Sequence, residues 1–157
     1  MILPIVAYGD PVLRKPGAPL APDYPNLAQL IDDMFETMYG ANGVGLAAQQ
    51  VGLALRLFVV DTTSMVRGEH AEAEVDGFKH AFLNAEILDQ AGNPWPYTEG
   101  CLSIPGIRED VLRQPVITLR WQDPSFTWHE ATFSGLRARV IQHEYDHTQG
   151  KLFVDYL

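Results

Sequence analysis

The chain has 157 residues, of which 46% are hydrophobic and 20% charged, the size and balance of one globular domain. Its formal net charge of −9, with no basic run longer than Arg14-Lys15, argues against a surface that binds nucleic acid. No segment approaches the roughly 18 apolar residues of a membrane span, the first residues do not resemble a signal peptide, and the single Cys101 excludes an internal disulfide. We expect one domain over residues 1–157, in the cytoplasm and without affinity for membranes.

The first half of the chain predicts one helix and one strand. Residues 14–25 contain four prolines and predict an extended, irregular arm. Apolar residues then recur at helical spacing over about 26–40, with Asn26 as the candidate N-cap. Residues 57–60 form a short apolar run typical of a buried strand. The polar, acidic residues 62–77 predict a surface loop.

Strands dominate the second half, followed by a second helix. Residues 78–89 and 96–103 are predicted strands, and apolar and polar residues alternate over 117–121 as in a half-buried strand. A turn then leads into a hairpin partner over 126–133, and a helix is expected over about 135–149. The expected fold class is α+β, with antiparallel β-sheets wrapped around this central helix, plus the N-terminal amphipathic helix.

The second helix carries the pattern HExxH within the segment QHEYDH. His143 and His147 lie four residues apart, on one face of a helix, so both imidazoles can reach one metal ion. Glu144 is close enough to accept a proton from a water molecule on that metal. The alternative is two ordinary helix residues, one of them buried and satisfied by hydrogen bonds, but Leu136 and Val140 fall on the same stripe as both histidines. The histidines therefore face inward, which favours a metal-dependent hydrolase.

A catalytic metal site of this kind usually takes three protein ligands and leaves one position open. The extended pattern HExxHxxGxxH fails, because residue 153 is Phe, and Asp155 is the only downstream carboxylate. The upstream candidates are Cys101, His70, His80 and His129. Cys101 is favoured because Gly100 before it allows close approach to the backbone, and a thiolate with two imidazoles suits iron(II), zinc, nickel or cobalt.

Three separate segments resemble signatures of the peptide deformylase family. GVGLAAQQ over 43–50 is similar to the family's GxGLAAxQ, EGCLS over 99–103 matches its EGCLS, and QHEYDH over 142–147 matches its QHExxH. Their order and spacing agree with the family, and the similarity extends over most of the chain. Thr148 departs from the leucine that commonly follows the second histidine.

The resemblance implies an enzyme that removes the N-formyl group from the formyl-methionine of nascent polypeptides and releases formate, through attack of a metal-bound water on the formyl carbon. It implies one divalent metal ion per chain, Fe2+ in the first place, with Zn2+, Ni2+ or Co2+ as substitutes. Transient contact with the ribosome is an expected partner interaction, without direct binding to nucleic acid.

The resemblance also assigns roles to individual residues. It implies metal ligation by Cys101, His143 and His147, and general base and acid catalysis by Glu144. It implies oxyanion stabilisation by Gln50 and by the backbone N–H of Leu102. Substrate contacts are expected from Val44, Gly45, Gly100 and Arg108.

Two other interpretations stay open from the residues. One is a general HExxH metallopeptidase, which would use a downstream carboxylate as the third ligand. The other is a non-catalytic module around a structural metal, which would need four protein ligands. Arg139, on the second helix, is expected either to shape the methionine pocket or to face water.

Overall fold

The computed structural model describes residues 1–64 and 78–157. In this part of the chain, a five-stranded sheet, a two-stranded sheet and two α-helices confirm the α+β class with antiparallel sheets. The larger sheet has the order β1 (Gly45–Ala47), β2 (Leu57–Asp61), β3 (Lys79–Ala91), β6 (Val116–Gln122) and β7 (Trp128–Ser134). The smaller one pairs β4 (Trp95–Cys101) with β5 (Ile104–Arg113), and the helices are α1 (Leu27–Gly40) and α2 (Gly135–Thr148).

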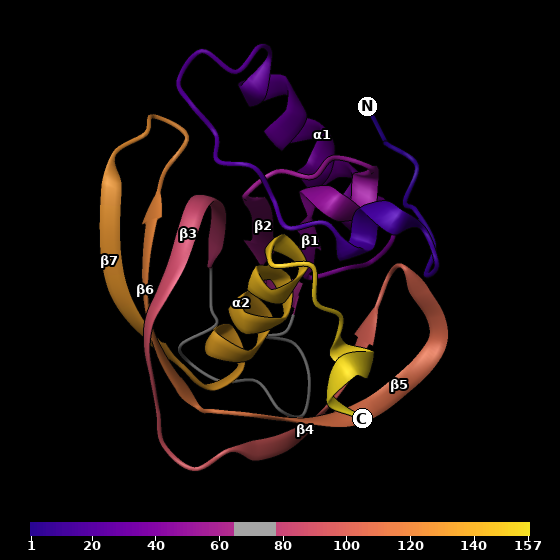
Figure 1. Ribbon diagram of the computed structural model, residues 1–157, viewed down its shortest axis with the longest axis vertical. Coiled ribbons are helices and arrows are strands. Elements are labelled where there is room, and N and C mark those ends of the chain that lie inside the picture. Colours follow the sequence, from indigo (N-terminus) through magenta and orange to yellow (C-terminus); the bar gives the residue numbers. More distant parts are fainter. Residues whose placement is uncertain (65–77) are drawn as a thin grey trace.

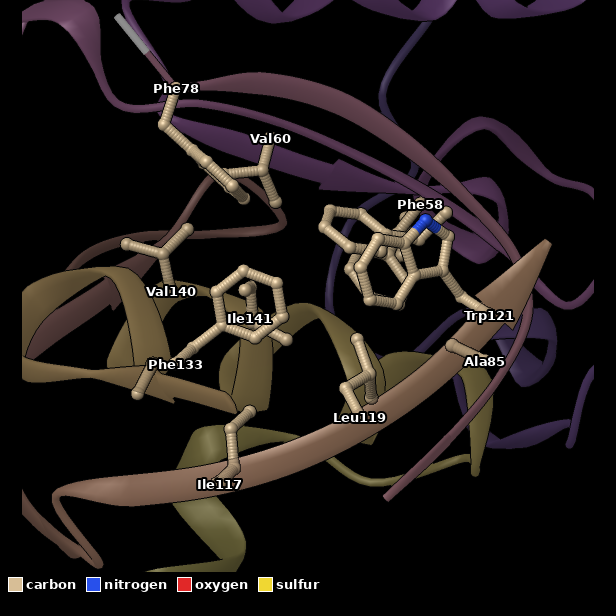
Figure 2. Packing of buried hydrophobic residues seen from close by; sticks show 13 residues of the cluster. Phe58, Val60, Phe78, Ala85, Ile117, Leu119, Trp121, Phe133, Val140 and Ile141 are labelled. Carbon is tan, nitrogen blue, oxygen red and sulfur yellow. The ribbon is translucent and has the colours of Figure 1, made fainter. Parts of the chain in front are cut away.

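Helix α2 occupies the middle of the molecule, with the curved strands β3, β6 and β7 on one side and the β4–β5 hairpin on the other (Figure 1). Apolar residues of the larger sheet and of the helix pack against each other in between (Figure 2). Strand β6 contributes Ile117, Leu119 and Trp121, the alternating residues that predicted it, and α2 contributes Val140 and Ile141. The core therefore fixes the helix that carries the HExxH pattern.

Helix α1 covers the other end of the larger sheet. Its Met34, Phe35 and Met38 are buried together with Leu57 and Val59 of β2. Residue Asn26 does occupy the N-cap position, but it has a left-handed backbone with φ 56° and its side chain makes no capping hydrogen bond. The predicted N-cap position is therefore confirmed.

The β4–β5 hairpin differs most from the prediction. The strand expected over 96–103 ends at Cys101, and a second strand, β5, begins at Ile104 after a two-residue turn. Seven of the ten residues of β5 are exposed, Ile107 and Leu112 as well as charged ones, so the apolar alternation that identifies half-buried strands is missing from it. This turn places Cys101 at the tip of the hairpin, beside α2.

The surface loop predicted over 62–77 falls mostly on residues 65–77, which lie outside the described part of the chain. Within the described part, no helix has the length and apolar character needed to cross a membrane.

Candidate metal centre

Three potential metal ligands converge from two elements. Cys101 ends β4, whereas His143 and His147 lie one turn apart on α2. One ligand atom from each of the three lies within 4.8 Å of the other two, and Cys101 Sγ is 3.5 Å from His147 Nε2. A thiolate and two imidazoles at these separations can hold one transition-metal ion.

The other candidates for the third ligand lie elsewhere. The carboxylate of Asp155 accepts hydrogen bonds from Arg14 Nη1, at 2.7 Å, and from the backbone N–H of Leu152. His80 on β3 and His129 on β7 do not belong to the group, and His70 lies outside the described residues. Among the described residues, the group contains three potential protein ligands rather than the four of a closed structural site.

Glu99 orients the first histidine. Its Oε1 lies 2.9 Å from Nδ1 of His143, which leaves Nε2 of that ring for a metal. Carboxylates bonded to metal-ligating histidines in this way fix the tautomer and the orientation of the ring. His147 is buried, and burial together with the neighbouring His143 lowers its pKa well below the ordinary value, which favours the neutral ring that binds metals. Its Nδ1 has no hydrogen-bond partner among the described residues.

Two guanidinium groups compensate the buried charge of Glu99. Arg113 donates from Nε and Nη2 to its two carboxylate oxygens, at 2.7 and 3.0 Å, and Arg139 Nη1 donates to Oε2 at 2.6 Å. Burial by itself would raise the pKa of Glu99, but hydrogen bonds from His143 and Arg113 lower it to about 2. Glu99 is therefore a stable anion that can hold the imidazole in place.

Glu144 lies against the backbone of β1. Its side chain is buried, and burial raises the pKa of its carboxyl group to about 7. A methyl group added at Gly45 would come within 2.8 Å of Glu144 Oε2, so only a glycine leaves room for this carboxylate. The absence of a side chain at Gly45 thus sets the position of Glu144.

The amide of Gln50 is held with its nitrogen towards the candidate metal ligands. Gln50 lies in the short 3-10 helix η2 (Ala48–Val51), which directly follows β1. Its Oε1 accepts a hydrogen bond from the backbone N–H of Ala47 at 3.0 Å. Its Nε2 then lies 3.4 Å from Cys101 Sγ and 3.4 Å from the hydroxyl of Ser103. A buried N–H donor beside the ligands can stabilise negative charge that develops there.

A cavity of about 480 Å³ opens onto this group of side chains. Nearly all the site residues predicted from the sequence line it, namely Val44, Gly45, Gln50, Gly100, Cys101, Leu102, Arg108, His143 and Glu144. His147 does not line it and is buried behind the other two ligands. Arg139 lines the cavity and is only 3% exposed, so of its two expected positions the one facing water was wrong.

Sequence reasoning missed the residues around Glu99. Arg113 lies at the end of the unpredicted strand β5, and its Nη1 also donates to Asp146 of α2 at 2.8 Å. Glu99 was recognised within its motif but without a role of its own. One hint was present in the sequence, an acidic residue two positions before a candidate ligand.

Comparisons with known proteins agree over the full length of the chain. The sequence model of the polypeptide deformylase family matches residues 2–157. The peptide deformylase of Flavobacterium johnsoniae is 55% identical over 159 residues, which cover 99% of this chain and 81% of the relative. That of Christiangramia forsetii is 52% identical and covers 100% of this chain and 82% of its own.

Solved structures give the same picture. The crystal structure of peptide deformylase from Thermotoga maritima has a TM-score of 0.89 and 37% identity, covering 100% of this chain and 98% of that chain. The one from Thermus thermophilus has a TM-score of 0.88 and 40% identity, covering 100% and 86%. Both similarities include the part of the fold that carries the candidate metal centre.

Proposed function

This chain belongs to the polypeptide deformylase family of hydrolytic enzymes, and we propose that it removes the N-formyl group from the formyl-methionine of nascent polypeptides and releases formate. One observation carries the proposal. Cys101, His143 and His147 come together at a cavity that also contains the carboxylate of Glu144 and the amide of Gln50. These are the parts that hydrolysis of an amide requires: ligands, a base and an oxyanion donor.

The donor set fits a divalent transition metal, which is in keeping with the metal dependence of the family. Cys101, His143 and His147 would hold one ion per chain, Fe2+ by resemblance, with Zn2+, Ni2+ or Co2+ as substitutes. When bound, the ion supplies a Lewis acid that lowers the pKa of water from about 15.7 towards about 7. The anionic Glu99 keeps the ring of His143 directed towards that ion.

Glu144 acts as the general base and then as the general acid. Its carboxylate takes the proton of the water molecule that adds to the formyl carbon. It returns this proton to the amide nitrogen as the carbon–nitrogen bond breaks, giving formate and a free amino group. A pKa of about 7, raised by burial, suits both tasks near neutral pH.

The tetrahedral oxyanion receives two hydrogen bonds. Gln50 Nε2 is one donor, and its orientation is supported by the bond from Ala47 N–H to Oε1. The backbone N–H of Leu102, in the turn after β4, is the second. Loss of one such donor typically costs about 3 kcal/mol of transition-state stabilisation.

The substrate occupies the 480 Å³ cavity with its first side chain. A cavity of this volume has room for a methionine side chain together with part of the peptide that follows it. The peptide backbone then follows the cavity edge, with contacts from Val44, Gly45, Gly100 and Arg108. Residues 1–157 act as one catalytic domain. The enzyme acts on nascent chains in the cytoplasm and contacts the ribosome only transiently.

Formate release tests the proposal directly. Purified protein is assayed on a formyl-Met-peptide, with the matching acetyl-Met-peptide as the control substrate, before and after chelation. We expect formate from the first substrate, no acetate from the second, and loss of activity on chelation with recovery on adding Fe2+, Ni2+ or Co2+. Internal cleavage of either peptide would instead point to a general metallopeptidase, and release unaffected by chelation would refute the role of the metal.

A further inference from the structure

An exposed tyrosine near the C-terminal end of the described chain is linked to His143 by a continuous series of hydrogen bonds. Tyr156 is 46% exposed and lies in the 3-10 helix η5 (Phe153–Tyr156). Its hydroxyl donates to Asp146 Oδ2 at 2.8 Å, and the same oxygen accepts a hydrogen bond of 2.8 Å from Arg113 Nη1. Arg113 donates through its other two nitrogens to Glu99, which contacts Nδ1 of His143.

The same short helix also touches His143 directly. Phe153 is 1% exposed, and its ring stacks on the His143 ring with 5.9 Å between centroids and an interplanar angle of 29°. The ring of Tyr156 meanwhile packs under the Arg113 guanidinium, 5.0 Å from its central carbon. The segment η5 therefore supports one face of the imidazole and, through three intermediate side chains, its Nδ1.

We propose that η5 is a positioning element of the metal centre, and that Tyr156 acts through Asp146, Arg113 and Glu99 to fix the ring of His143 for metal binding. The proposal rests on the metal centre of the proposed function. Tyr156 does not line the cavity, so its proposed effect on the site runs through the side chains between it and His143. Its hydroxyl bonds to Asp146, and Asp146 in turn holds Nη1 of Arg113. The other two nitrogens of that guanidinium are bonded to the two carboxylate oxygens of Glu99. A planar guanidinium bonded at both ends has a fixed orientation.

The test measures metal binding without requiring turnover. The metal-free full chain is titrated with Co2+, and both the dissociation constant and the Co2+ absorption spectrum are recorded for the wild type and for Tyr156→Phe. Tyr39→Phe is the matched control. Tyr39 is 45% exposed and donates its hydroxyl to the carboxylate of Asp61 at 2.5 Å, but it lies on α1 and does not line the cavity at the candidate metal centre.

We expect Tyr156→Phe to weaken Co2+ binding about threefold to tenfold, below the 10- to 100-fold typical of residues that contact a ligating histidine directly. Its spectrum should shift, and its KM for formyl-Met-peptide should stay at the wild-type value once the metal is saturating. Asp146→Asn should weaken binding as well, and Tyr156→Phe should add little in that background, because both changes interrupt the same series of bonds.

Three results would overturn the proposal. The first is a Co2+ affinity and spectrum of Tyr156→Phe equal to those of Tyr39→Phe. The second is that the losses of Co2+ affinity caused by Tyr156→Phe and Asp146→Asn add in the double variant, and the third is a raised KM of Tyr156→Phe at saturating metal. Each of these leaves formate release by the wild type untouched, so failure of this proposal is distinguishable from failure of the proposed function.

Discussion

Replacing Gly45 by alanine tests how closely the backbone of β1 sets the position of Glu144. The added methyl group would lie 2.7 Å from Cγ, 2.8 Å from Cδ and 2.8 Å from Oε2 of Glu144. Ordinary contacts begin at 3.4 Å, so the carboxylate must retreat by about 0.6 Å. Glu144 is 2% exposed, within a helix that packs against β1 and β2, and has little room to move.

The expected result is a fall in kcat of about 10- to 100-fold, since a misplacement approaching 1 Å at a reacting group can cost about 100-fold. Affinity for Co2+ should not change, because the three atoms nearest to the added methyl group all belong to Glu144 and none to a proposed ligand. Steady-state formate release and Co2+ titration measure the two quantities on the same preparation.

Gly43→Ala provides the comparison. Its added methyl group would meet Leu102 Cδ1 at 2.9 Å, at the end of a flexible side chain that can shift, and Met38 Cγ only at 3.4 Å, an ordinary contact distance. We expect a smaller loss of kcat there. If Gly45→Ala keeps as much activity as Gly43→Ala, the packing of Gly45 against Glu144 does not set the catalytic geometry and the reasoning is refuted.

Four further changes test separate parts of the site. Glu144→Gln should retain Co2+ and lower kcat by about 100- to 10,000-fold in formate release; near-normal turnover would exclude its role as base. Cys101→Ser should weaken Co2+ binding in titrations, because a hydroxyl is a harder ligand than a thiolate, and an unchanged affinity would argue against ligation. Gln50→Ala should lower kcat about 100- to 1,000-fold at constant KM, and a change in KM alone would contradict an oxyanion role. In the metal-free protein, Glu99 has a pKa lowered to about 2 from an ordinary 4.5, so its stabilising contribution is present above pH 4.5 and is lost as the pH falls towards 2. The free energy of unfolding, measured with urea, should therefore fall less between pH 4.5 and 2 for Glu99→Gln than for the wild type. An equal fall in both proteins would contradict the assignment.

Hydrophobic periodicity predicted the elements whose side chains face the core. The alternation of Ile117, Leu119 and Trp121 corresponds to buried positions of β6, and the apolar stripe of α1 to the residues packed on β2. Strand β5 was missed because, among the described strands, it pairs with β4 alone and leaves most side chains in water. Its pairing is a backbone property with no apolar signal in the sequence.

The candidate site divides in the same way. Two histidines at helical spacing and a third ligand required by coordination chemistry were enough to indicate Cys101 from the sequence alone. The ion pairs of Glu99 could not be anticipated, because Arg113 is 14 residues away and Arg139 is 40 residues away along the chain. Whether such charges are buried together depends on how β4, β5 and α2 pack, which no local pattern encodes.

X-ray absorption spectroscopy of the zinc-loaded protein tests the central claim, that Cys101, His143 and His147 bind one metal ion together. We predict one sulfur neighbour at about 2.3 Å and two histidine nitrogens at about 2.0 to 2.1 Å, with one metal per chain. A first shell made of nitrogen and oxygen only, without sulfur, would contradict it.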